Sequence, residues 1–108
     1  MARDMIQEAP TTEDCSAVRE RWIAELRRQG HRQCEHIFVL GGTVCALGLL
    51  REVSGQRASI RDSVDSVGAL AGLAGWQAWE ITYRNDGTDG FGKHTFMQIA
   101  DVVESWFR

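Results

Sequence analysis

The residues of this chain that could bind a metal ion are two histidines and two cysteines in its central part, His31, Cys34, His36 and Cys45. Imidazole and thiolate groups are the usual zinc ligands, and four of them could form a tetrahedral site. The spacing argues against such a site, because a single residue separates Cys34 from His36, whereas paired ligands usually enclose two to four. Cys45 stands in an apolar run, where a thiol usually acts as a small hydrophobic side chain. We therefore expect no metal and no cofactor, and these four residues are weak candidates.

The residue types of a catalytic nucleophile, a base and an orienting acid are also present, in Cys34, Cys45, His36, His94, Asp86 and Asp101. No nucleophile elbow or comparable local signature surrounds them. A catalytic cysteine needs a polar, partly exposed setting that lowers its pKa, and the apolar neighbours of Cys45 predict the opposite. The sequence thus favours a protein that is not an enzyme, with a small metal-dependent enzyme as one alternative.

Residues 85–96 have the outline of a calcium loop, with Asn85 and Asp89 at positions 1 and 5 and Gly90 at position 6. Position 12 is Phe96, which cannot replace the bidentate glutamate that normally binds calcium there. We interpret this segment as a glycine-rich turn that leads into a capped helix.

The end of the first expected helix is locally basic. Residues 16–34 carry five arginines against two glutamates, and Arg27, Arg28 and Arg32 are the candidate phosphate contacts. The net charge of the chain is −3, however, and binding to a polyphosphate favours a positive surface. The apolar spacing of residues 96–107 also resembles the first helix of a helix-turn-helix, but no recognition helix follows it. We favour a solvated arginine face with glutamate partners and keep nucleic-acid binding as an alternative.

Four tryptophans are many for a chain of 108 residues. Trp22 and Trp106 lie on the apolar stripes of expected helices, which predicts that they belong to the core. Trp76 and Trp79 flank a glycine-rich segment. Stripe spacing favours a core position for them too. The alternative is a partly exposed protein-binding surface, because tryptophan is enriched at interfaces.

Two helices are predicted by their apolar periodicity. The first begins at Thr11 or Thr12 and ends before Gly30, a natural left-handed residue after a helix. Its apolar stripe consists of Cys15, Val18, Trp22 and Leu26. The last begins with a capping box, Thr95 and Gln98, and continues to Phe107.

The middle of the chain leaves alternatives open. Residues 34–40 favour a short strand that ends at Gly41-Gly42. Two alternatives are possible for the residues that follow: a helix from Val44 to Val53 capped by Thr43, or a second strand. Good helix formers favour the helix. Residues 56–66 are expected to form a loop, and 67–75 to pack closely through Gly68 and Gly72 while breaking into turns. Residues 76–84 fit a helix or a strand.

Composition predicts one globular domain over residues 11–108, preceded by a flexible arm over 1–10. The expected fold class is mostly α, with α+β through one short hairpin near 34–53 as the alternative. An odd number of cysteines, three, predicts reduced thiols in the cytoplasm. No apolar run is long enough for a membrane span, so no membrane partner is expected. The predicted core residues are Trp22, Leu26, Phe38, Leu47, Leu50, Ile99, Val103 and Trp106.

Two ordered motifs, residues 22–27 with 45–53 and residues 84–87 with 95–103, resemble those of a family of small, uncharacterised phage and prophage proteins. The first is Trp22-Ile23-Ala24-Glu25-Leu26-Arg27 followed by residues 45–53, similar to the family's W-x-x-A-L-R and C-C-L-G-V-L-C-E. The second is residues 84–87 followed by residues 95–103, similar to L-N-D-x-G and S-F-x-x-I-A-D-x-I. The second and third family cysteines correspond to Ala46 and Arg51 here, so a metal site built on them would be lost. The resemblance implies no known activity.

No motif identifies an activity, so three hypotheses follow. We favour a phage-like accessory protein that binds another protein, with Trp76 and Trp79 as contact residues. The alternatives are a nucleic-acid-binding protein that uses Arg27, Arg28 and Arg32, and a small metal-dependent enzyme.

Overall fold

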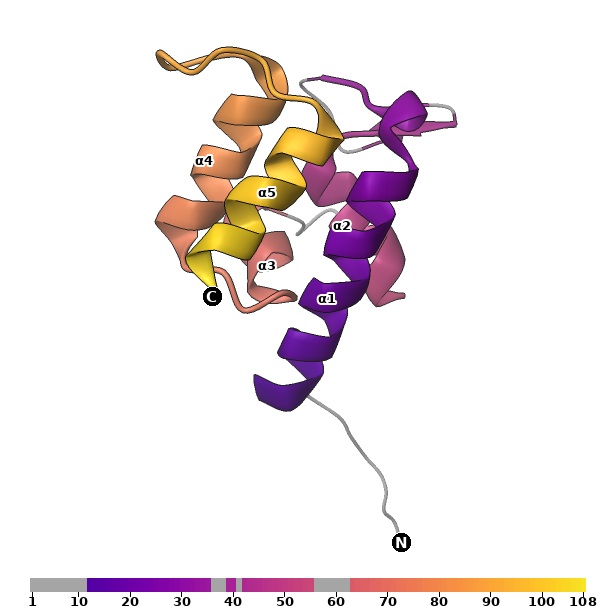
Figure 1. The fold of residues 1–108 in the computed structure, drawn as a ribbon, viewed down its shortest axis with the longest axis vertical. Coiled ribbons are helices and arrows are strands. Elements are labelled where there is room, and N and C mark those ends of the chain that lie inside the picture. Colours follow the sequence, from indigo (N-terminus) through magenta and orange to yellow (C-terminus); the bar gives the residue numbers. More distant parts are fainter. Residues whose placement is uncertain (1–11, 36–38, 41, 56–62) are drawn as a thin grey trace, which may run out of the picture.

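The computed structural model describes residues 12–35, 39–40, 42–55 and 63–108, and this part of the chain is mostly helical, as predicted (Figure 1). The α-helices are α1 (Thr12–Arg28), α2 (Ala46–Ser54), α3 (Val64–Ala69), α4 (Gly75–Asp86) and α5 (Phe96–Trp106). A 3-10 turn, η1 (Gly30–Arg32), follows α1, and the strands β1 (Val39–Leu40) and β2 (Thr43–Val44) precede α2. The expected arm over residues 1–10 lies outside the described residues.

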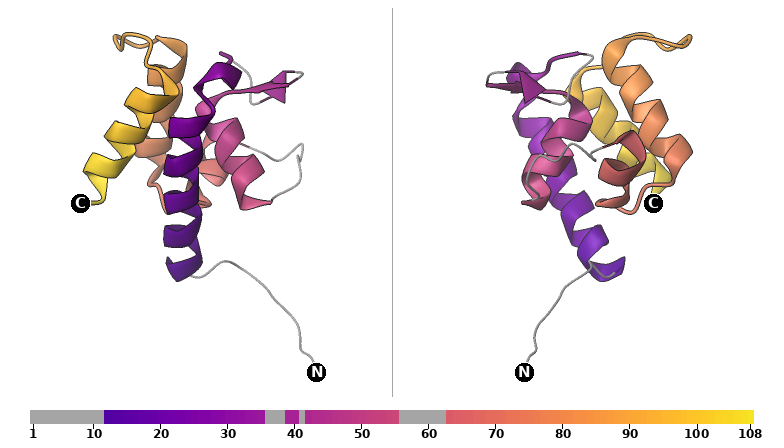
Figure 2. Two further views of the ribbon diagram at one scale, coloured as in Figure 1. Left: turned by 45° about the vertical axis from the view of Figure 1, so that its right-hand side comes forward. Right: turned by 180° about the vertical axis from the view of Figure 1, so that it is seen from behind.

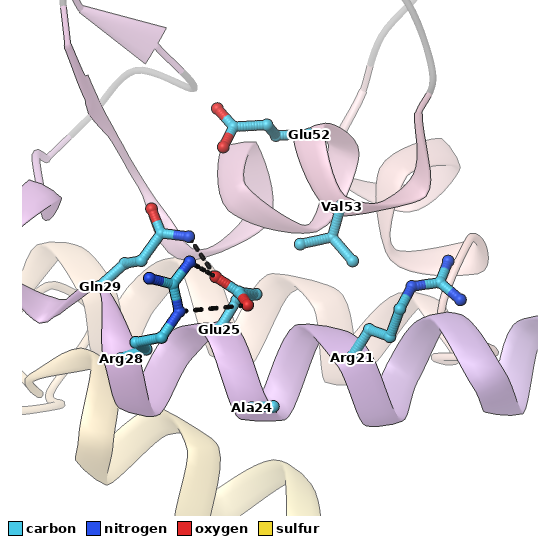
Figure 3. A pocket seen from close by; sticks show the side chains of 7 residues that line it. All are labelled: Arg21, Ala24, Glu25, Arg28, Gln29, Glu52 and Val53. Carbon is cyan, nitrogen blue, oxygen red and sulfur yellow. Dashed lines mark hydrogen bonds and ion pairs between the residues drawn. The ribbon is translucent and has the colours of Figure 1, made fainter.

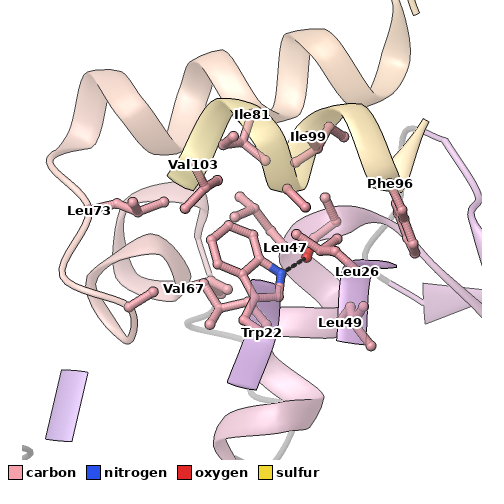
Figure 4. Close-up of a cluster of buried hydrophobic side chains, with 14 of the residues drawn as sticks. Trp22, Leu26, Leu47, Leu49, Val67, Leu73, Ile81, Phe96, Ile99 and Val103 are labelled. Atoms are coloured by element: carbon pink, nitrogen blue, oxygen red, sulfur yellow. Dashed lines mark hydrogen bonds between the residues drawn. The ribbon is translucent and has the colours of Figure 1, made fainter. Parts of the chain in front are cut away.

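The short helix α2 is the centre of the fold. Its first five residues, Ala46 to Leu50, are all buried. Helices α1, α3 and α4 pack around it, and α5 lies against α1 and α4 (Figures 1 and 2). The largest buried apolar side chains around α2 are Trp22, Leu26, Val67, Ile81, Phe96, Ile99 and Val103 (Figure 4). No helix of the described part is long and apolar enough to cross a membrane.

Most of the predicted core is confirmed. Trp22, Leu26, Leu47, Leu50, Ile99 and Val103 are buried, and Trp106 is a partly buried residue packed against them. Phe38 lies outside the described residues. The indole of Trp22 is fully enclosed, and its Nε1–H donates a hydrogen bond of 2.9 Å to the Ala46 carbonyl (Figure 4). Since a buried indole N–H needs an acceptor, this bond links α1 to the start of α2.

Residues 39–54 contain both structures that the sequence left open. The hairpin pairs Val39 with Val44 and Leu40 with Thr43 in antiparallel register, and α2 starts two residues later. The predicted cap at Thr43 is wrong, because Thr43 belongs to β2. Cys45 caps the helix instead, its Sγ accepting a hydrogen bond of 3.3 Å from the Gly48 N–H.

Two predicted boundaries also differ from the structure. Gly30 is not a left-handed residue after α1 but the first residue of η1. The Gln33 N–H donates a hydrogen bond to the Gly30 carbonyl, which closes this tighter 3-10 turn. The sequence predicts a loop over residues 56–66, but α3 already begins at Val64. Its start is fixed by a capping box that Ser63 and Ser66 form. Residues 56–62 lie outside the described part.

The segment over residues 67–75 packs closely and breaks into turns, as predicted. Gly68 lies where α3 meets α4, and a Cβ added there would stand 2.5 Å from the Cβ of Ala78. Gly72 turns the chain between the two helices at a φ of 75°. The following residues, which fitted a helix or a strand, form α4.

We expect the substitution Gly68→Ala to lower the free energy of unfolding by about 1–2 kcal/mol. Overpacking costs about 1–3 kcal/mol, which exceeds the gain of about 0.5–1 kcal/mol from alanine in a helix. Urea unfolding followed by circular dichroism measures the difference. The double variant G68A/A78G removes the collision, so the two substitutions should be less destabilising together than their separate effects predict. Additive effects would contradict close packing at this point.

Candidate functional site

Helix α4 has large side chains on two opposite faces. One face is buried against the core and consists of Ala78, Ile81 and Asn85. The opposite face repeats the same spacing of three and four residues with Trp76, Trp79 and Tyr83. Because each residue turns the helix by about 100°, the two sets point in nearly opposite directions. The core can cover only one of them.

The outward tryptophans of α4 are exposed. Trp76 retains 62% of its accessible surface and Trp79 retains 43%. The core position that stripe spacing favoured for these two residues is therefore wrong, because Ala78, Ile81 and Asn85 occupy the inner face. The partly buried Trp106 of α5 lies beside this surface, with its ring edge-on to Trp76 at a centroid distance of 5.5 Å.

The row of rings continues beyond the end of α4. Trp79 and Tyr83 have ring centroids 5.9 Å apart, and Phe91 in the following loop stacks on Tyr83 at 6.3 Å with an interplanar angle of 13°. We call Trp76, Trp79, Tyr83 and Phe91 the aromatic face of α4. These ring contacts hold the side chains in place before any partner arrives.

Arg84 and His94 fix the loop that carries Phe91. The Arg84 guanidinium lies 4.7 Å from the centre of the Phe91 ring and forms an ion pair of 2.8 Å with Glu80. The Nδ1 of His94 lies 2.6 Å from the Gly92 carbonyl, which can only accept, so Nδ1 carries the proton. The Nε2 of His94 then accepts from Arg84 at 2.9 Å. The imidazole thus joins the Gly92 carbonyl to Arg84 at the end of the aromatic face.

The arginines proposed for nucleic-acid binding are all paired with carboxylates. Arg27 lies 2.9 Å from Asp101 and 3.2 Å from Glu104 on α5. Arg28 lies 2.5 Å from Glu25, and Arg32 lies 2.9 Å from Glu52. These partners cancel much of the local positive charge. The arrangement resembles the solvated arginine face with acidic partners that the sequence favoured.

A groove of about 390 Å³ runs between α1 and α2 (Figure 3). Its lining residues are Arg21, Ala24, Glu25, Arg28, Gln29, Glu52 and Val53. The hydrogen bonds from Arg28 and then Gln29 lower the pKa of Glu25, and the hydrogen bond from Arg32 lowers the pKa of Glu52. Both carboxylates are thus ionised and already engaged, which makes them unsuitable as catalytic acids.

Cys45 has the properties of a structural thiol. Burial raises its pKa to about 11, so the thiol is protonated at neutral pH and is a poor nucleophile or metal ligand. Cys34 lies close to it, since the Cys34 N–H donates to the Val44 carbonyl at 2.9 Å. His31 lies in η1, and His36 falls outside the described residues. Among the residues that the structure describes, no three or more histidine, cysteine, aspartate or glutamate side chains are placed to hold a metal ion.

Asn85 is a buried structural residue that the sequence did not identify. Its Oδ1 accepts from the Ala46 N–H and from Gln33 Nε2, both at 3.1 Å. Its Nδ2 donates to the Cys34 carbonyl at 2.8 Å and to Asp86 at 2.9 Å. These four bonds use the full capacity of the amide. The residue that would open a calcium loop therefore faces the protein interior, and the loop after it is the glycine-rich turn that the sequence favoured.

Comparison with known proteins does not assign this chain to a family. No family model, curated protein or solved structure matches the chain. The resemblance to phage and prophage proteins thus remains a prediction. The aromatic face of α4 is the candidate site that the side chains themselves support best.

We expect Cys45 to resist alkylation by iodoacetamide at pH 8 in the folded protein. With a pKa of about 11, only a small fraction of the thiol is ionised at that pH, and the thiolate is the reacting form. Peptide mass spectrometry after alkylation with and without urea measures the modification, and the unfolded sample shows that all three cysteines can react. Equal modification of Cys45 in both samples would contradict its role as a buried cap.

We expect Asn85→Ala to lower the free energy of unfolding by about 3 kcal/mol. The substitution leaves the buried Ala46 N–H unpaired, which costs about 1–3 kcal/mol, and removes the hydrogen bond to the Cys34 carbonyl, which contributes about 1 kcal/mol. Chemical unfolding at neutral pH measures the change.

The variant Asn85→Asp provides a matched control. It keeps the acceptor for the Ala46 N–H but turns a carboxylate toward the Cys34 carbonyl, which should raise the pKa of the new carboxyl in the folded state. Its destabilisation should therefore be large at neutral pH and decrease as the pH falls toward the range where the carboxyl is protonated. A loss below about 0.5 kcal/mol for N85A would show that the network is dispensable.

Proposed function

We propose that this protein is a non-enzymatic, phage-like accessory protein of the cytoplasm that binds another protein through the aromatic face of α4. The observation that carries the proposal is the exposure of Trp76 and Trp79 on a helix whose inner face already supplies the core. The resemblance of two motifs to those of phage and prophage proteins supports the phage-like origin.

Exposed, ordered tryptophans are well suited to protein binding. Burying apolar surface stabilises a complex by about 25 cal/mol per Å², and tryptophan offers more of this surface than other residues. The contacts of Trp76 with Trp106 and of Trp79 with Tyr83 hold both rings in place. A partner therefore loses little binding energy to the ordering of these side chains.

The distribution of charge favours a protein partner over a nucleic acid. The chain has a net charge of −3, and the arginines proposed as phosphate contacts already pair with carboxylates. Neutralising phosphates requires cations that are free to replace the counterions of the nucleic acid. The enzyme alternative has less support, since Cys45 is protonated and serves as a helix cap.

We expect Trp76→Ala and Trp79→Ala each to reduce partner capture from a lysate of the source cells by about tenfold or more, as substitutions of central interface tryptophans do. The captured protein should be recovered equally from nuclease-treated and untreated lysate. Quantitative mass spectrometry of the bound fraction measures both effects.

Met97→Ala is the matched control for this experiment. Met97 is 49% exposed but contacts Arg27, on the side of α5 that faces α1. Its substitution should leave capture unchanged, and thermal unfolding of all three variants shows whether they fold. Full capture by folded Trp76 and Trp79 variants would refute the proposal, as would recovery that disappears after nuclease treatment.

A further inference from the structure

The end of α4 and the loop after it contain the dipeptide Asp-Gly twice, as Asp86-Gly87 and Asp89-Gly90. An aspartate that precedes glycine can rearrange without an enzyme, because glycine has no Cβ to shield its amide nitrogen from the neighbouring carboxyl group. The product is isoaspartate, in which the backbone continues through the former side chain. The reaction needs a carboxyl group and an amide N–H that are free to approach each other.

The first of these dipeptides is held in place by its contacts. The Gly87 N–H donates a hydrogen bond of 2.8 Å to the Tyr83 carbonyl at the end of α4. The Asp86 carboxylate accepts a hydrogen bond of 2.9 Å from Asn85 Nδ2. A Cβ added at Gly87 would lie 3.1 Å from the Cβ of Lys93, so the backbone has little room to rotate. Both reacting groups of the first dipeptide are therefore engaged.

The second dipeptide occupies the two central positions of an exposed turn. The Phe91 N–H donates a hydrogen bond of 3.1 Å to the Thr88 carbonyl, which closes the turn. Asp89 and Gly90 have φ angles of 53° and 83°, the positive values that a type I′ turn requires. Both residues are exposed, and the loop that carries them projects from the ends of α4 and α5 (Figure 1).

Both reacting groups of the second dipeptide are accessible to each other. The closing hydrogen bond of a β-turn joins its outer residues, so the amide between the central residues has no partner within the turn. In the described part of the chain, no group accepts from the Gly90 N–H or pairs with the Asp89 carboxylate. A Cβ added at Gly90 would have no atom within 4 Å apart from its chain neighbours, so there is space for a ring.

We propose that Asp89-Gly90 is a site of spontaneous isoaspartate formation in the folded protein, whereas the fold protects Asp86-Gly87. The Gly90 amide nitrogen attacks Cγ of the Asp89 carboxyl group. The N–Cγ bond forms, and the carboxyl OH leaves as water together with the amide hydrogen. Water then opens the resulting succinimide ring. Cleavage between the nitrogen and the backbone carbonyl carbon gives isoaspartate, and cleavage of the N–Cγ bond restores aspartate, so the final mass of the chain is unchanged.

Isoaspartate changes the loop because it adds one methylene group to the backbone of the turn. The geometry that aligns the Phe91 N–H with the Thr88 carbonyl is then lost. Phe91 is the end of the aromatic face, where its ring stacks on Tyr83 at 6.3 Å and lies 4.7 Å from the Arg84 guanidinium. The modification therefore releases the end of the aromatic face from α4. This inference goes beyond the proposed binding function and does not depend on it.

The test is incubation of the full-length protein for several weeks at 37 °C and pH 6. Peptide mass spectrometry with electron-transfer dissociation then distinguishes isoaspartate from aspartate at each position. We expect isoaspartate to form at least about fivefold faster at Asp89 than at Asp86, because each ordinary hydrogen bond that must break first corresponds to about fivefold in rate. A sample in guanidinium chloride is the matched control, in which unfolding should make the two rates similar.

Two variants extend the test. Asp89→Asn tolerates a positive φ and reacts through the same ring with loss of ammonia, so the change in mass from amide to acid also reports the reaction. Asp89→Glu would need a six-membered ring and should remain unmodified. Hydrogen exchange of the Phe91 amide, measured by nuclear magnetic resonance, should become faster during incubation of the unsubstituted protein but not of D89E.

Equal rates at Asp86 and Asp89 in the folded protein would overturn the proposal. The same holds if position 89 reacts in guanidinium chloride but neither Asp89 nor the D89N variant reacts in the folded state. Unchanged exchange of the Phe91 amide in protein converted to isoaspartate would refute the release of Phe91.

Discussion

The structure depends on the buried first turn of α2. The first N–H groups of any helix have no partner within the helix, and here they lie in the protein interior, where an unpaired group is costly. Two side chains meet this requirement: Asn85 of α4 accepts from the Ala46 N–H, and Cys45 accepts from the Gly48 N–H. Beside them, the indole N–H of Trp22 in α1 donates to the Ala46 carbonyl. The start of one short helix thus sets the positions of two others.

This requirement also determines which face of α4 is left for a partner. Asn85 must point inward to reach Ala46, and the spacing of the helix then brings Ala78 and Ile81 to the core. Gly68 allows the close approach of α3 to the same face, next to Ala78. Trp76 and Trp79 are turned outward as a consequence. The proposed binding surface and the stability of the fold therefore rest on the same helix orientation.

Several residues with chemically versatile side chains serve structural purposes. Cys45 could have been a metal ligand or a nucleophile, but its burial keeps the thiol protonated and its position makes it a cap. Asn85 could have opened a calcium loop, but its amide is saturated by four bonds inside the protein. Arg32 could have contacted phosphate, but Glu52 engages it. For Asn85 and Arg32 the partners come from distant parts of the sequence, so residue type and spacing alone could not reveal them, whereas the apolar run around Cys45 already indicated its burial.

The sequence by itself determined the elements whose signals are local. The apolar stripe containing Trp22 and Leu26 predicted α1, the capping box at Thr95 predicted the start of α5, and Gly68 predicted a close helix contact. The tertiary structure decided that residues 75–86 form a helix, that Asn85 is buried and that Trp76 and Trp79 face outward. Both faces of that segment carry large side chains, so periodicity could not distinguish the inner from the outer one. The inner face is determined by the buried Ala46 N–H at the start of α2, which needs an acceptor. Asn85, 39 residues away in the sequence, provides this acceptor only when its face of α4 points inward.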